Sequence, residues 1–367
     1  MKALTSKEQE IFELICKNPQ ISQDELAKVL NITRSSVSVH ISNLLKKRYI
    51  EGKGYIINRT DKVVVVGASM IDIVGRSFDP LLSHDSNPGK IKVSAGGVSR
   101  NISENLSRIG CNVSLISAIC DDSFGQVIKE SCYKANIDIS DSYILADSVT
   151  TSYLAILNNK GDMNLALSDT TALDEMPVSH LVDKAHVLKS ARVIVVDAAL
   201  PSDVMDYILE NFSDIPIFLD PVSIGKAKSI KNKLTNFHTI KCNKLEAEFL
   251  SGISINNDDD IIEVSDYFSK LGVSQVFITL GPEGVYYKSA SDKGFYRGPV
   301  IQVENATGAG DAFMAGLVYG FLKEYDTKDT VVFSHAMSSL ALQANTTVNT
   351  NISVSKVIKE MEKVNNE

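Results

Sequence analysis

One short stretch of the sequence places a carboxylate directly after three residues that leave the backbone bare: Gly308, Ala309 and Gly310 precede Asp311. The apolar pattern behind them is typical of a helix, so these residues would form its first turn. A helix start leaves backbone N–H groups unpaired and carries a partial positive charge, which favours a bound phosphate. Asp311 would then accept a proton from a hydroxyl group that attacks the phosphorus. Close helix packing, with Asp311 as a cap, would explain the same residues, so this stretch alone leaves both interpretations open.

The elements that must position such a turn follow from residue 62 onward, where short β-branched runs alternate with helical patterns. This alternation predicts a largely parallel sheet with helices on both faces. The unbroken apolar runs 63–66 and 193–196 indicate strands that are buried on both sides. Ligands of such sheets bind beyond the carboxyl ends of the strands. The polar residues that we expect there are Asp72, Asp197, Asp220, Asn243 and Thr279.

Two stretches do not follow this scheme. Residues 90–97 and 150–169 alternate apolar and polar side chains, and the second stretch contains the turn sequence Asn-Asn-Lys-Gly at residues 158–161. Alternation with a tight turn is typical of antiparallel strands with one exposed face. We therefore predict a small antiparallel flap outside the main sheet, formed near residues 72–95 and 150–169.

The first sixty residues differ from the rest in charge. They hold ten Lys and Arg residues against six Asp and Glu residues, a net charge of +4, and the overall net charge of −8 leaves −12 for residues 61–367. Three helical patterns are followed by a hairpin sequence at residues 52–54. We expect Leu26, Val29 and Leu30 to face inward in the second helix, and Leu44 and Leu45 in the third.

Three helices and a basic-tipped hairpin resemble a winged helix-turn-helix domain, whose third helix enters the DNA major groove. The resemblance implies that residues 1–60 bind DNA, with Ser35, Ser36 and Ser38 approaching the bases and Arg34 contacting phosphates. A small helical dimerisation domain is the alternative. The modest charge predicts DNA binding that is weak in a monomer and strongly dependent on salt.

The composition excludes several classes of protein. The apolar runs are far shorter than the ~20 residues of a membrane span, and the N-terminal stretch has no apolar signal-peptide core. The five cysteines are scattered without a CxxC pair, which argues against a zinc site and a disulfide framework. These features predict a cytoplasmic location.

Two motifs together resemble the signatures of the PfkB family of sugar and nucleoside kinases, which have the ribokinase-like fold. They are AGGVSRNISENLSRIG at residues 95–110 and NATGAGDAFMAGL at residues 305–317. The resemblance covers nearly all of residues 62–367 and implies a doubly wound, mostly parallel α/β sheet with a small flap. The sequence departs from the family pattern at Ala306, and at Asn305, where many members carry an Asp that helps to hold a monovalent cation.

The family resemblance implies the roles of the phosphate-side residues. Asp311 would be the catalytic base, and residues 308–310 would form the anion hole. ATP and Mg²⁺ are the implied cofactors, with Mg²⁺ positioned by Asn243 and Glu246, partly through water. Further nucleotide contacts are implied for Thr279, Gly281, Gly284 and His335, and Asn305 and Thr307 are implied for K⁺. A helix His is more often simply packed, so His335 has that second interpretation.

On the acceptor side the resemblance implies that Asp72 holds sugar hydroxyls. Gly96, Gly97 and Asn101 would line the same pocket. Several stretches, including residues 86–101 and 150–169, are most similar to the pseudouridine kinase branch of the family. This implies transfer of the ATP γ-phosphate to the 5′-hydroxyl of pseudouridine, and pairing of flap edges in a homodimer. The rival interpretations are a kinase for uridine, inosine or ribose, and a ligand-sensing regulator built on a kinase fold.

Overall fold

The computed structural model describes residues 4–18, 21–47, 49–50, 61–299, 301, 303–304 and 307–364. The chain divides into two compact units, Met1–Thr60 and Asp61–Glu367. The hairpin predicted at residues 52–54 lies outside the described residues, as do Asn305 and Ala306. Among the described residues, no helix is long and apolar enough to cross a membrane.

The described part of the first unit consists of α1 (Ser6–Lys17), α2 (Gln23–Leu30) and α3 (Arg34–Lys46). Thr5 and Ser22 begin α1 and α2 with reciprocal capping boxes to Glu8 and Glu25. The helices pack around an apolar cluster: Ile11, Ile15, Leu26, Val37, Ile41, Leu44 and Ile50.

Two of the inward positions predicted for this unit are wrong. Val29 is 61% exposed and Leu45 is 40% exposed. Short helices in a bundle of this size bury only a narrow stripe, which Leu26 and Leu44 occupy.

The second unit confirms the predicted parallel sheet. Its described residues form an eight-stranded sheet in the order β14-β13-β12-β11-β10-β9-β1-β4. The pairings from β4 to β12 are parallel, whereas β12, β13 and β14 pair antiparallel. The strands are β1 (Lys62–Val66), β4 (Asn112–Ile116), β9 (Val193–Asp197), β10 (Ile217–Asp220), β11 (Thr239–Asn243), β12 (Gln275–Thr279), β13 (Val285–Lys288) and β14 (Lys293–Tyr296).

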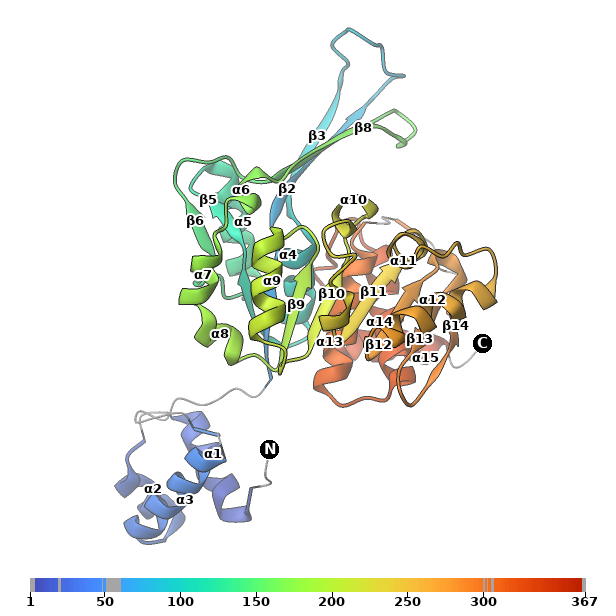
Figure 1. Ribbon diagram of the computed structural model, residues 1–367. Helices are drawn as coiled ribbons and strands as arrows, with labels where there is room; N and C mark the ends of the chain where they lie inside the picture. The colour runs from blue at the N-terminus through green and yellow to red at the C-terminus, as the bar shows by residue number, and fades with distance from the viewer. Residues whose placement is uncertain are drawn as a thin grey trace. The chain divides into compact units, whose positions relative to one another are not determined.

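Helices cover both faces of this sheet (Figure 1). Two apolar clusters fill the spaces between the sheet and the helices. One face is covered by α4 (Val98–Arg108), α5 (Ser123–Lys134), α13 (Ala309–Leu322), α14 (Thr327–Leu342) and α15 (Val354–Val364). On the other face lie α6 (Thr171–Asp174), α7 (Val178–Asp183), α8 (Ala185–Lys189), α9 (Ser202–Asn211), α10 (Ile224–Ala227), α11 (Lys244–Ser251) and α12 (Asp258–Lys270).

Glycines bring α13 close to α14. A Cβ on Gly316 would lie 2.5 Å from the Cα of Ser334, and a Cβ on Gly320 would lie 2.6 Å from Thr330 Oγ1. The first contact is with backbone, so Gly316 requires glycine, whereas a Cβ on Gly320 would displace the Thr330 side chain. The close packing holds α13, and with it the turn at its N-terminus, against the rest of the unit.

The predicted flap is present as a separate four-stranded sheet in the order β3-β2-β7-β8, extending away from the main sheet in Figure 1. It consists of β2 (Met70–Ser77), β3 (Gly89–Gly96), β7 (Ser152–Leu157) and β8 (Met163–Asp169). β2–β3 and β7–β8 are antiparallel hairpins, as predicted, but β2 and β7 pair in parallel. Both strands enter the flap from the main unit, so their shared direction follows from the chain path. A parallel pair, β5 (Ala118–Cys120) with β6 (Tyr143–Leu145), completes the described strands.

Candidate active site

The turn at residues 308–311 has the geometry expected of a helix N-terminus with a bare backbone. Gly308 has φ 87° and precedes α13, and a Cβ there would overlap the carbonyl of Thr347. Ser338 Oγ donates to the carbonyl of Ala309 at 2.8 Å and fixes the turn from α14. The turn is therefore packed against α14 and Thr347, and no side chain from Gly308 or Gly310 covers its amides.

Asp311 is 9% exposed in the first turn of α13. Its Oδ2 accepts a hydrogen bond of 2.9 Å from Asn101 Nδ2 on α4, although the two residues are 210 positions apart. Burial, followed by repulsion from Asp220, raises the pKa of Asp311 to about 7, against the opposing effects of Lys241 and Asn101. A carboxylate with a pKa near neutrality is suited to accept a proton in a reaction at neutral pH.

Lys241 is a site residue that the sequence analysis missed. It lies on β11, and its Nζ forms a buried ion pair of 2.6 Å with Asp220 Oδ2 at the end of β10. A Cβ on Gly310 would lie only 3.1 Å from this Nζ, so the ammonium group borders the bare turn. A lysine between two apolar residues of a short strand, Ile240 and Cys242, is the signal that could have identified it.

Asp197 connects the chain segments that carry the predicted acceptor residues. It is fully buried at the end of β9, and burial raises its pKa. It accepts hydrogen bonds from Ser99 Oγ at 2.6 Å and from the backbone N–H groups of Ala68 and Ala199 at 2.8 and 2.9 Å. These bonds tie the loop after β1 to the start of α4, so Asp197 has a structural role.

Asn243 and Glu246 first of all cap α11. Asn243 Oδ1 accepts from the N–H of Glu246, and Glu246 Oε2 accepts from the N–H of Asn243, both at 2.9 Å. Burial raises the pKa of Glu246, against the effect of Lys241. In the described part of the chain, no group of three or more His, Cys, Asp or Glu side chains could hold a metal by itself. Asn243 and Glu246 offer few oxygen ligands, which fits Mg²⁺, because this ion keeps most of its waters.

A cavity of about 390 Å³ opens beside the bare turn. Its lining brings together six of the predicted residues: Thr279, Gly281, Gly284, Ala309, Gly310 and His335. Burial lowers the pKa of His335 and so favours the neutral ring, which lies 5.1 Å from the ring of Tyr296. The size and apolar walls of the cavity suit a nucleotide base and ribose.

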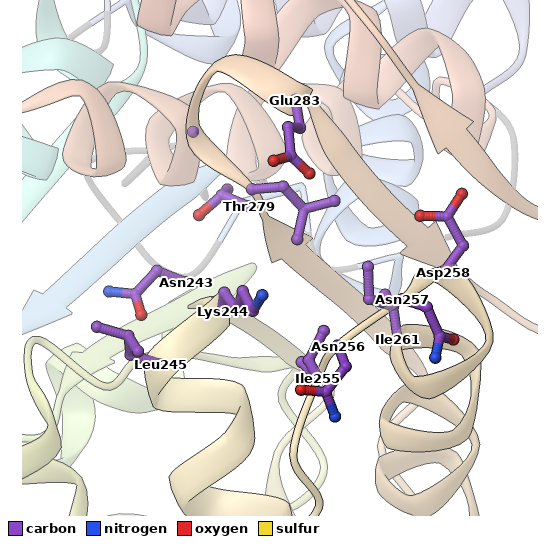
Figure 2. Close-up of a pocket in the computed structure, with 12 residues that line it drawn as sticks. Asn243, Lys244, Leu245, Ile255, Asn256, Asn257, Asp258, Ile261, Thr279 and Glu283 are labelled. Atoms are coloured by element: carbon purple, nitrogen blue, oxygen red, sulfur yellow. The ribbon is translucent and has the colours of Figure 1, made fainter.

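A second pocket of about 320 Å³ shares Thr279 and Gly281 with this cavity. Figure 2 shows Asn243 and Lys244, at the start of α11, facing Thr279 and Glu283 across this pocket. Lys244 was not among the residues predicted from the sequence. Its ammonium group brings positive charge to a pocket that is also lined by the carboxylates of Asp258 and Glu283.

Among the residues predicted to bind the acceptor, the Asp72 carboxylate lies against the backbone of Gly96. The approach is so close that a Cβ on Gly96 would overlap the carboxylate. Burial raises the pKa of Asp72, against the effect of Arg100. Gly97 has φ 96°, and a Cβ there would lie 2.6 Å from the carbonyl of Ala68. Asn101, predicted to line this pocket, binds Asp311 as well. Of the predicted acceptor residues, Asn101 is thus the one that contacts the predicted base.

The predicted cation residues are only partly described. Thr307 lies in the turn before Gly308, whereas Asn305 is outside the described residues. A role of either residue in binding K⁺ remains a prediction.

Residues 60–353 match the pfkB family of carbohydrate kinases. The chain belongs to the PfkB family. Residues 4–51 match a winged helix-turn-helix DNA-binding family, in agreement with the three helices of the first unit.

Relatives and a solved structure agree with this membership. The chain is 35% identical to the pseudouridine kinase of Escherichia coli over 82% of its own length and 97% of that protein. It is also 35% identical to the uncharacterized sugar kinase YeiI of Escherichia coli, over 97% of its length and 98% of that protein. The structure of Arabidopsis thaliana ribokinase complexed with ribose and ATP has a TM-score of 0.72 and 18% identity, and the match covers 82% of this chain and 99% of that one. The ribokinase-like fold class is therefore confirmed.

The contact between Gly96 and Asp72 gives a prediction. Gly96→Ala should displace the Asp72 carboxylate and raise the KM for the phosphoryl acceptor about tenfold or more, while the KM for ATP stays within about twofold. Initial rates with each substrate varied separately measure both constants. Gly225→Ala is the control, since a Cβ there meets nothing closer than Ser223 Oγ at 3.8 Å. An equal rise in both KM values would contradict the placement of Asp72 in the acceptor site.

Proposed function

We propose that this PfkB-family kinase transfers the γ-phosphoryl group of ATP to the 5′-hydroxyl of a nucleoside, with pseudouridine as its preferred acceptor. The observation that carries the proposal is the position of Asp311, buried beside the bare turn and hydrogen-bonded to Asn101 of the acceptor side. This arrangement supplies a base and an anion site within one turn of helix.

The proposed reaction uses the residues of this site in order. Asp72 holds the ribose hydroxyls, since one carboxylate can accept hydrogen bonds from two neighbouring hydroxyls. Asp311 takes the proton of the 5′-hydroxyl as its oxygen bonds to the γ-phosphorus, and the bond to ADP breaks. The amides of residues 308–310 hold the phosphoryl oxygens. Mg²⁺, positioned by Asn243 and Glu246, would neutralise phosphate charge when bound.

The flap supports a nucleoside as the acceptor. In its register, Asp72 on β2 is paired with Ser94 on β3 and with Tyr153 on β7, and Tyr153 is paired with Ser168 on β8. Directly paired residues share one face of a sheet, so an aromatic ring lies beside the sugar-binding carboxylate. Such a ring can stack on a base, which a simple sugar lacks. The 35% identity to a pseudouridine kinase supports pseudouridine, but the equal identity to a sugar kinase makes sugars the rival acceptors.

An acceptor panel tests this proposal. The protein with Mg²⁺ and ATP should phosphorylate pseudouridine faster than uridine, inosine, ribose or fructose, as detected by mass spectrometry of the products. Asp311→Asn should lower kcat on the best acceptor by about two to four orders of magnitude, because the base is lost, while ATP still binds. Preference for a sugar without a base would overturn the acceptor assignment, and near wild-type activity of the variant would remove Asp311 from its role.

We further propose that the first unit binds DNA through the exposed face of α3. Arg34, Ser35, Ser38 and Lys46 are exposed there, whereas Val37 and Ile41 are buried. The net charge of +4 in residues 1–60 favours phosphate contacts. A regulator that senses its ligand through the kinase unit is compatible with this arrangement.

Electrophoretic mobility shifts with the DNA upstream of its own gene test this second proposal. The full chain should bind, and binding should weaken steeply between about 50 and 200 mM salt. Ser38→Glu, which adds a negative charge to the exposed face of α3, should abolish the shift, whereas a chain that starts at Asp61 should never bind. Equal binding by the full chain and by the shortened chain would exclude the first unit as the DNA site.

We also propose a homodimer formed through the flap. The flap face opposite Asp72 carries exposed apolar side chains: Ile91, Val93, Leu165 and Leu167. A second copy would cover this face and place two DNA-binding units in one particle. Sedimentation of the full chain measures its size directly, and a monomer at micromolar concentration would contradict the dimer.

A further inference from the structure

Asn101 lies between two groups with opposite hydrogen-bonding capacity. Its Nδ2 donates to Asp311 Oδ2 at 2.9 Å, and its Oδ1 accepts from Arg100 Nη1 at 2.9 Å. A guanidinium group only donates and a carboxylate only accepts, so the amide has one orientation that satisfies both neighbours. Turned by 180°, it would place its oxygen against the carboxylate and its NH₂ group against the guanidinium.

Arg100 is itself held in place from three elements. It is 4% exposed, and its Nη2 pairs with Glu104 on the same helix and donates to Ser131 Oγ on α5 at 2.6 Å. Its Nη1 also donates to the carbonyl of Ala95 on β3 at 3.3 Å. The guanidinium therefore holds one N–H group in place beside Asn101. This donor determines which way the Asn101 amide is oriented.

We propose that Arg100 is a positioning residue, which orients the Asn101 amide so that its nitrogen faces Asp311 and keeps this carboxylate charged. The inference rests on the proposed function, in which Asp311 is the base. A donor that faces a carboxylate stabilises its charged form, whereas an oxygen in the same place favours the protonated form. Only the charged form of Asp311 accepts the proton of the acceptor hydroxyl.

The remaining charges around Asp311 make this orientation decisive. Asp220 on β10 and Asp197 on β9 disfavour a charged Asp311, and Lys241 on β11 favours it. Burial is the largest influence, and the resulting pKa of about 7 makes the charged fraction sensitive to a single hydrogen bond at neutral pH. Arg100 also acts on the acceptor carboxylate, because its charge lowers the pKa of Asp72 against the effect of burial.

The dependence of kcat on pH, measured at saturating acceptor, separates the two effects of Arg100. Arg100→Met should move the acid limb of kcat upward by about one pH unit or more, so that kcat falls about tenfold at pH 6.5. At pH 9, where Asp311 is charged in either protein, kcat should return to within about threefold of the wild type. Arg100→Lys, which keeps a donor, should show a smaller shift.

The matched control is Arg108→Met, on the same helix. Arg108 Nε donates to Glu104 Oε1 at 2.8 Å, and its Nη1 donates to the carbonyl of Thr350 at 2.9 Å. The variant removes the same charge beside the same carboxylate and should leave the acid limb in place. In Arg100→Met, the buried Glu104 carboxylate keeps Arg108 as its partner but loses Arg100. If this variant does not fold, the double variant Arg100→Met with Glu104→Gln lowers the buried charge further and should show the same shift.

The outcomes are distinct from those of the proposed function. If the wild type phosphorylates none of the acceptors, the proposed function fails. If the wild type is active and Arg100→Met lowers kcat equally at every pH, or if Arg108→Met gives the same shift, the positioning role of Arg100 is overturned.

Discussion

The burial of charge at the carboxyl ends of β9, β10 and β11 is the constraint on which the rest of the site depends. Asp197, Asp220, Asp311 and Lys241 are each 9% exposed or less. A buried charge is costly unless partners compensate for it, and the compensation here is unequal. Asp197 accepts three hydrogen bonds and Asp220 forms an ion pair with Lys241, whereas the side chain of Asp311 accepts from Asn101. Asp311 is thus the weakly compensated carboxylate, which gives it the proton affinity of a base.

Three features of the fold bring the residues of this site together: the parallel strands, the packing of α13 on α14 and the register of the flap. Parallel strands end at one edge of the sheet, so residues far apart in the sequence meet there. The packing of α13 on α14 through Gly316 and Gly320 holds the bare turn and Asp311 together against the rest of the unit. The flap adds a carboxylate and an aromatic side chain, Asp72 and Tyr153, that only its register places side by side. In the proposed reaction, helices and strands of the main sheet position the phosphate side, and the flap supplies the surface that selects the acceptor.

Local pattern predicted much of this structure. The apolar runs and the turn at residues 158–161 predicted the sheet and the flap, and Asp220, Asn243 and Thr279 were expected at strand ends, where the structure has them. The hydrogen bond between Asn101 and Asp311 could not be predicted, because nothing in the local pattern connects residues 210 positions apart. Lys241 was missed because a lysine in a buried strand is explained only by its partner on the neighbouring strand. The parallel pairing of β2 with β7 depends on the path of the chain through the main sheet, which alternation within each strand does not reveal.

A crystal structure of the protein with a non-hydrolysable ATP analogue, Mg²⁺ and pseudouridine would test the central claim most directly. We expect the terminal phosphate to accept hydrogen bonds from the amides of residues 308–310, and the 5′-oxygen of the nucleoside to lie within about 3.2 Å of an Asp311 oxygen. A terminal phosphate bound away from this turn, or a 5′-oxygen that contacts another base, would contradict the account.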